Sequence, residues 1–138
     1  MLLSFGSNSQ DIGVFNQIDS IVTAVDLLAS KGSLDTLRRG LLNEGGTTSD
    51  IFMLKQGQEV QKISVVNKLK YYSEAIIFKN GKPIFAQFVQ RDGAKWTFYL
   101  IGETAFFKNG DRFNKGSSSY WGSTITAYLD MFEDQIIK

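Results

Sequence analysis

The side chains that most often perform catalysis or bind metal ions are sparse in this chain of 138 residues, which contains no cysteine and no histidine. A disulfide framework, a thiolate or imidazole metal site, a cysteine nucleophile and a Ser-His-Asp triad are therefore excluded. General acid–base chemistry would depend on carboxylates, lysines or tyrosines. We accordingly predict no catalytic residue, no metal site and no cofactor, and we expect that the protein is not an enzyme.

Two remaining features could still support chemistry. Glu103 lies in the most apolar stretch of the chain, where burial would raise its pKa, and a second carboxylate such as Glu74 or Asp111 could act with it. An exposed Glu103 at a sheet edge is the simpler interpretation. The run Gly116 to Ser119 precedes an expected helix and could hold phosphate, but it lacks the Gly-Lys-Ser/Thr ending of a phosphate-binding loop and is better explained as a helix cap.

Basic residues gather in the middle of the chain, although the total charge is only +1. Residues 58–116 hold ten basic and five acidic groups, and the cations flank predicted turns. A basic rim of this kind could bind nucleic acid or phosphate, or could simply keep the sheet soluble by discouraging edge-to-edge pairing. The candidate anion-binding residues are Lys79, Lys82, Lys108, Arg112 and Lys115.

Helical spacing of apolar residues follows Asp11 and continues to Leu28, with Gly32 as a left-handed stop. Leucines at 34, 37, 41 and 42 predict a second, shorter helix, and residues 51–54 could add one more turn. The stripe from Trp121 to Ile136 predicts a C-terminal helix after the loop at 114–119.

Residues 60–107 have the composition of β-strands, with turn signals at Asn80-Gly81, Asp92-Gly93 and Asn109-Gly110. We predict an antiparallel meander of four or five strands. Gly102 either bends one long strand as a bulge or makes another turn, and we prefer the bulge, which would place both Asn-Gly turns at the same end of the sheet. The predicted fold class is α+β: N-terminal helices, the meander sheet and a C-terminal helix.

Apolar residues occupy both faces of the predicted strands, so each face needs a cover. The first five residues are also apolar and precede a polar spacer, so residues 1–10 are either a docking arm or a frayed tail, followed by a single domain at 11–138. Aromatic residues are enriched in protein interfaces. The candidate interface residues are Leu2, Leu3, Phe5, Tyr72, Phe106, Tyr120 and Trp121.

Hydrophobic residues make up 43% of the chain, which is enough for a folded core, and no apolar run approaches the roughly 20 residues of a membrane span. With no targeting signal, we expect a cytoplasmic or virion location. The leading hypothesis is a non-catalytic assembly or protein-binding subunit, possible in a virion, phage tail or secretion apparatus, with a protein partner or a homo-oligomer. The alternative is a nucleic-acid or phosphate-binding domain.

Overall fold

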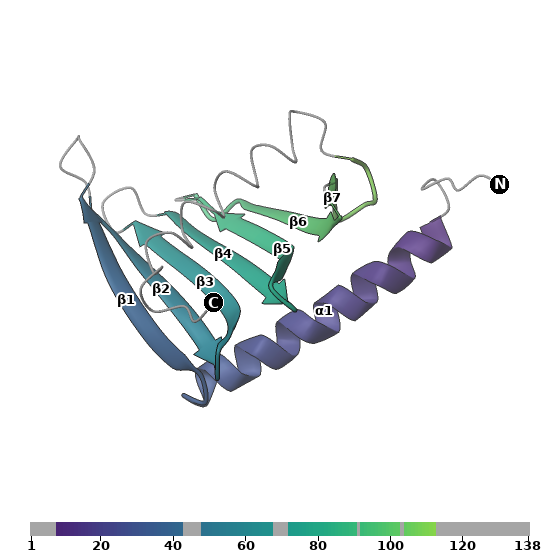
Figure 1. The fold of residues 1–138 in the computed structure, drawn as a ribbon. Helices are drawn as coiled ribbons and strands as arrows, with labels where there is room; N and C mark the ends of the chain where they lie inside the picture. Colours follow the sequence, from purple (N-terminus) through teal and green to yellow (C-terminus); the bar gives the residue numbers. More distant parts are fainter. Residues whose placement is uncertain (1–7, 43–47, 68–71, 91, 103, 113–138) are drawn as a thin grey trace.

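The computed structural model describes residues 8–42, 48–67, 72–90, 92–102 and 104–112. One long helix, α1 (Asn8–Ser30), precedes a seven-stranded antiparallel sheet whose strands are neighbours in chain order (Figure 1). The strands are β1 (Asp35–Leu42), β2 (Thr48–Gln56), β3 (Glu59–Asn67), β4 (Tyr72–Lys79), β5 (Lys82–Val89), β6 (Lys95–Ile101) and β7 (Thr104–Phe107). The α+β class and the antiparallel meander are therefore confirmed, whereas the predicted strand number is too low.

The predicted N-terminal helix is present, but it begins earlier than Asp11, because Asn8 to Gln10 already belong to α1. Its end is as predicted. Gly32 has a φ of 69°, and the Ser33 N–H donates to the Leu28 carbonyl at 2.9 Å while the Gly32 N–H donates to Ala29 at 3.1 Å. These two bonds form a Schellman ending, which satisfies carbonyls that the last turn would leave unpaired.

The second predicted helix is wrong, because residues 35–42 form β1, and the helical turn predicted at 51–54 lies within β2. Leu34 is buried against α1 just before the strand begins, and Leu37 packs on the opposite face of the sheet. The leucine spacing that imitates a helix therefore comes from residues on two different faces. Thr36 and Gly40 are weak helix formers, and pairing with β2 along all of β1 decides the outcome.

Gly102 makes a turn and not the predicted bulge. Its φ is 63°, and Ile101 pairs with Thr104 across the hairpin that joins β6 to β7. The Asn80-Gly81 hairpin has the two positive φ angles of a type I′ turn, at 53° and 78°. A further turn at Gly102 reverses the chain once more, so the Asn80-Gly81 and Asn109-Gly110 turns lie at opposite ends of the sheet.

α1 crosses the strands along one side of the sheet, which we call the helix face (Figure 1). A 23-residue helix is about 34 Å long, close to the width of seven strands at about 4.8 Å spacing. The ring of Phe15 stacks on Tyr99 with centroids 4.1 Å apart and an interplanar angle of 8°, and it also contacts Phe106 at 6.2 Å. Phe85 meets Tyr99 edge-on at 5.8 Å. The start of α1 is thus held by aromatic contacts with β6 and β7.

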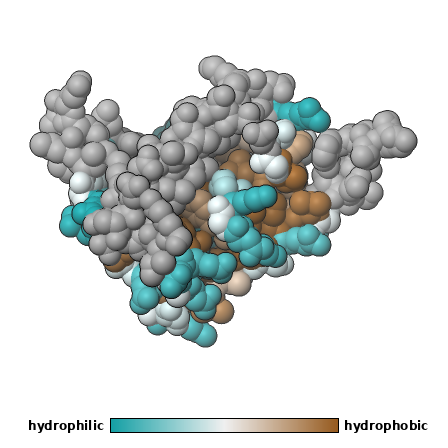
Figure 2. All heavy atoms as spheres, in the orientation of Figure 1, coloured by the Kyte–Doolittle hydropathy of each residue, from teal (hydrophilic) through white to brown (hydrophobic). Residues whose placement is uncertain are grey.

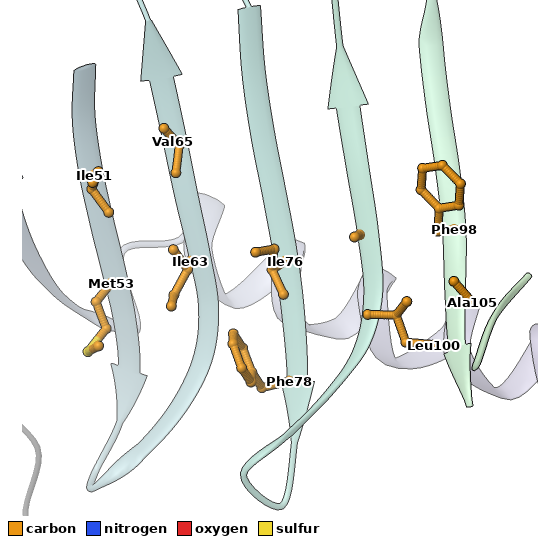
Figure 3. Close-up of a cluster of buried hydrophobic side chains, with 10 residues drawn as sticks. Ile51, Met53, Ile63, Val65, Ile76, Phe78, Phe98, Leu100 and Ala105 are labelled. Carbon is orange, nitrogen blue, oxygen red and sulfur yellow. The ribbon is translucent and has the colours of Figure 1, made fainter. Parts of the chain in front are cut away.

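The opposite face of the sheet carries a second apolar cluster. Figure 3 shows its side chains projecting away from α1, which passes behind the strands. Ile51, Met53, Ile63 and Ile76 at its centre are fully buried. Both faces of the sheet are therefore apolar, as predicted. Among the described residues no helix or strand packs on this second face, and the predicted C-terminal helix at 121–136 lies outside them.

Candidate protein-interaction surface

Two acidic residues on one flank of α1 bind the sheet. The Tyr99 hydroxyl donates to the Asp19 carboxylate at 2.8 Å, and the Lys62 Nζ donates to Asp26 at 2.9 Å. Burial raises the pKa of Tyr99, and the hydrogen bond to Asp19 and its negative charge add to that rise. The phenol therefore stays protonated as a donor, and both acids attach α1 to strands that follow much later in the chain.

A shallow depression of about 480 Å³ lies along the same flank, lined by Asn16, Asp19, Ser20 and Thr23. The Asp19 carboxylate in this depression accepts the hydrogen bond from Tyr99, and the Ser20 hydroxyl donates to the Asn16 carbonyl at 3.1 Å. No base contacts that serine within the described residues. The depression therefore lacks the paired nucleophile and base that covalent catalysis needs.

The described ranges contain no group of three or more acidic residues placed to hold a metal ion. α1, the one helix in those ranges, is not apolar enough to span a bilayer. Glu103 and the run Gly116 to Ser119, the two sequence features that could have supported catalysis or phosphate binding, lie outside the described residues.

Part of the helix face lies beyond the residues that contact α1. The strand register aligns a row of side chains one step further along the strands: Phe52, Ser64, Ala75, Gln87 and Thr97. All five are half-buried. The Gln87 side-chain amide donates to the Thr97 hydroxyl at 3.1 Å, and Phe52 belongs to neither apolar cluster. We call this row the open row; it combines polar and apolar side chains beside α1.

Apolar surface also gathers at the other side of the molecule. In Figure 2 hydrophobic atoms collect where β6 and β7 lie beside the first half of α1. Of the half-buried apolar residues of these elements, Val14 and Ile101 pack on the helix-face cluster, whereas Phe107 packs on the opposite cluster, with its ring centroid 5.3 Å from that of Phe98. Trp96, at the start of β6, is 48% exposed. These side chains extend the core to the surface at this end of the sheet.

The two edges of the sheet differ. β7 has four residues, and its outer edge is occupied by the following turn: the Phe107 N–H donates to Asp111 at 2.8 Å, and Phe106 forms a bridge with Arg112. β1 has eight residues and pairs with β2 along its whole length, but no described strand pairs with its outer edge. Within the described residues, β1 is therefore the longer of the two edge strands, and edge strands can pair with another chain.

The structure separates the predicted interface residues. Phe106 is 2% exposed and packs in the core against Phe15, so it offers no surface within the described part. Tyr72 is the first residue of β4, and its side chain is not described. The remaining candidates lie outside the described residues: Leu2, Leu3, Phe5, Tyr120 and Trp121.

The structure also divides the predicted basic rim. Lys79 and Lys82 flank the β4–β5 turn, whereas Lys108 and Arg112 flank the turn after β7, at the opposite end of the sheet. Lys115 lies outside the described residues. The four described cations therefore form two separate pairs, because the turn at Gly102 adds a strand that the bulge would not have added.

Sequence reasoning missed the β1 edge, because its leucines imitate a helix. The signals that could have revealed it are Thr36, which favours strands, and Gly40, which weakens a helix.

The chain matches no known protein family, no curated protein and no solved structure.

Proposed function

We propose that this protein is a non-catalytic, protein-binding assembly subunit that joins a neighbouring chain at the outer edge of β1. The observation that supports this most directly is the eight-residue edge itself, to which no described strand is bonded. A neighbour that adds a strand there would bind through main-chain hydrogen bonds.

The open row supplies side-chain contacts next to that edge. Arg38 of β1 lies beside Phe52, the first residue of the row, and forms an ion pair with Asp50. A partner strand provides affinity through main-chain hydrogen bonds, while side chains on the adjacent face provide specificity. A bound chain could thus form main-chain hydrogen bonds with β1 and contact the apolar and polar side chains of the open row.

The apolar start of the chain belongs to the same proposal. Leu2, Leu3 and Phe5 would dock on a neighbour, with Tyr120 and Trp121 as further contacts. Removing residues 1–7, which precede α1, tests this part separately, since we expect weaker association with little change in the helix content measured by circular dichroism.

The experiment for the β1 edge uses two proline variants, Asp35→Pro and Thr36→Pro. Neighbouring N–H groups on a strand point in opposite directions, so one proline removes an outward donor and the other breaks the ladder with β2. Both residues are exposed, which keeps the core out of the comparison. The variant that unfolds at nearly the wild-type temperature is the edge variant.

The full-length wild type and the edge variant are then cross-linked in a lysate of the source organism and in purified form, and the linked peptides are identified by mass spectrometry. We expect links between residues 34–42 and one specific strand-forming segment, and we expect the edge variant to lose them. Association that persists unchanged in the edge variant would rule out β1 as the binding edge. A chain that forms no specific protein contact in either setting would contradict the proposed function.

A further inference from the structure

We propose that the open row, together with the next row of side chains along the strands, binds a basic amphipathic helix of the partner, which lies beside α1 and antiparallel to it. This inference rests on the proposed function, because it takes the protein to bind a neighbouring chain, and it names the kind of segment that this neighbour contributes. Its basis is a set of four apolar residues that lie in neither apolar cluster of the sheet.

These residues form a stripe that crosses four strands on the helix face. Val66 and Val89 lie on the two strands next to that of Ala75, each one step diagonally from it in the register. Phe52 lies diagonally from Val66 in the same way. All four are half-buried, and none belongs to either apolar cluster. We call them the apolar stripe.

The apolar stripe keeps part of its surface exposed. On the opposite face of the same strands, Ile51, Ile63 and Ile76 are fully buried. Within the described residues α1 is the one element on the helix face, and its hydrogen bonds to Tyr99 and Lys62 lie one step along the strands from the open row. Because a contiguous exposed apolar patch marks a site of protein interaction, the stripe is suited to the apolar side chains of a partner.

The direction of the apolar stripe favours a helix as its occupant. The stripe crosses the strands as α1 does, whereas a bound strand would pair with an edge. An extended chain that crossed the strands would leave its own N–H and C=O groups unpaired above apolar side chains, while a helix pairs these groups internally. The two rows lie about 7 Å apart, and one helix of about 10 to 12 Å diameter covers both.

The adjacent flank of α1 favours basic residues on the bound helix. Asp19 lines the depression of α1 and binds Tyr99, which lies two residues from Thr97 of the open row on the same face. The Tyr99 hydroxyl is a neutral donor, so the Asp19 carboxylate keeps its negative charge. A lysine or arginine of the bound helix can lay its apolar stem along the stripe and place its charge in the depression.

Lys95 and the dipole of α1 set the direction of the bound helix. α1 begins at β6 and β7, where Phe15 stacks on Tyr99, and its later residue Asp26 binds β3. Helices carry partial positive charge at the start and partial negative charge at the end, so antiparallel neighbours bring opposite charges together. Lys95 of β6 is exposed and pairs with Val89 at the end of the stripe, where a cation favours a carboxyl end. Both features place the carboxyl end of the bound helix at β6.

The chain has no cysteine, so single introduced thiols can carry a photoreactive cross-linker. Ser64→Cys on β3 and Thr97→Cys on β6 place it at two points of the open row, three strand spacings or about 14 Å apart. A helix covers this distance in about ten residues and an extended chain in about four. Ala24→Cys is the matched control, because Ala24 is exposed on α1 outside the depression.

The labelled proteins are irradiated in a lysate of the source organism, and the linked residues are identified by mass spectrometry. We expect both open-row variants, but not the control, to link one basic segment at positions about ten residues apart, with Thr97→Cys nearer its carboxyl end. Positions about four residues apart overturn the helix, and the reverse order overturns its direction. Links to this same chain, within one molecule or in a second copy, overturn the partner, and so does an absence of links.

A synthetic peptide with the linked sequence then tests the apolar stripe by fluorescence anisotropy. The double variant Val66→Thr with Val89→Thr keeps the side-chain shape and removes apolar surface, so the peptide should bind about tenfold more weakly. Thermal melts followed by circular dichroism check that the double variant is folded. Wild-type affinity in the folded double variant overturns the stripe as the binding surface.

The same peptide tests the two charges. Asp19→Asn keeps an acceptor for the Tyr99 hydroxyl and removes the charge, and Lys95→Glu reverses the charge at β6, so each should weaken binding about two- to fivefold. Lys82→Glu is the control, because Lys82 is exposed at the opposite end of the sheet, and it should leave the affinity unchanged. Tighter binding to Lys95→Glu overturns the direction of the helix, and tighter binding to Asp19→Asn overturns its basic character.

The results separate this inference from the function beneath it. Links at residues 34–42 that the edge variant loses, without links from Ser64→Cys or Thr97→Cys, remove the bound helix and retain the binding edge. The reverse result retains the bound helix and removes β1 as the binding edge. A chain with no specific protein contact at either place contradicts both.

Discussion

Replacement of Phe15 by alanine should reveal how strongly α1 is held to the sheet. Phe15 is 6% exposed, its ring lies parallel to Tyr99 at 4.1 Å between centroids, and it also contacts Phe106. Truncation of a buried phenylalanine to alanine typically costs about 3 to 5 kcal/mol in free energy of unfolding. Because Phe15 lies near the start of α1, where the helix can shift to fill part of the space, we expect about 3 kcal/mol.

A graded series separates burial from ring geometry. Phe15→Leu keeps most of the apolar volume and loses the stacked contact with Tyr99, so it should cost about 1 to 1.5 kcal/mol. Leu27→Ala on the same helix is the control, since Leu27 is 53% exposed and its removal should change the stability by less than about 0.5 kcal/mol.

The assay is urea unfolding followed by far-ultraviolet circular dichroism, with the free energy taken from linear extrapolation. Natural domains are stable by about 5 to 15 kcal/mol, so the alanine variant should still fold but lose a large part of that reserve. If Phe15→Ala is no less stable than Leu27→Ala, α1 does not pack on β6 and β7 as described.

Three further predictions concern the backbone and a buried phenol. Gly13 lies within α1 with open space around it, so Gly13→Ala should raise the free energy of unfolding by about 0.5 to 1 kcal/mol in the same urea assay. Gly81 has a φ of 78°, so Gly81→Ala should instead lower it by about 1 kcal/mol or more, and an unchanged midpoint would argue against the type I′ turn. The raised pKa of Tyr99 means that the unfolded chain loses this proton first as pH rises. Stability should thus fall above about pH 10, by up to about 1.4 kcal/mol per pH unit, and Tyr99→Phe should show a shallower fall in thermal melts.

The parts of the fold that followed from the sequence are those with strong local signals. The period of α1, its stop at Gly32 and the type I′ turn at Asn80-Gly81 each depend on a few neighbouring residues. The apolar character of both sheet faces was also readable, because Ile76 and Ile77 are consecutive and both are buried, on opposite faces. For these features, the types of a few neighbouring residues were enough to predict the structure.

The errors arose where tertiary pairing outweighs local preference. The leucines of β1 imitate a helix, and the apolar run of β2 fits a short buried helix as well as a strand buried on both faces. Only the pairing of the two strands distinguishes these alternatives. Gly102 was ambiguous for another reason, because a positive φ serves a bulge and a turn equally well.

The candidate site was less predictable than the fold. Whether a strand lies at the edge of a sheet depends on the order of the strands, and no residue type in the sequence indicates that order. The sequence drew attention to aromatic residues, yet Phe106 is needed inside, where it meets Phe15. The prediction of one basic rim was wrong because it depended on the number of turns in the sheet. The additional turn at Gly102 places Lys108 and Arg112 at the opposite end of the sheet from Lys79 and Lys82.

The arrangement of α1 across the strands has a consequence for how the protein is made. Each strand pairs with the one just before it, so hairpins can form one after another as the chain leaves the ribosome. The helix is synthesised before the strands, but Asp19 binds Tyr99, which lies 80 residues further along the chain. Phe15 likewise packs on residues of the last two strands. The growing chain must therefore leave Phe15, the one aromatic side chain of α1, without its ring partners until the final hairpin is complete, and during this interval a chaperone or a neighbouring chain could bind it.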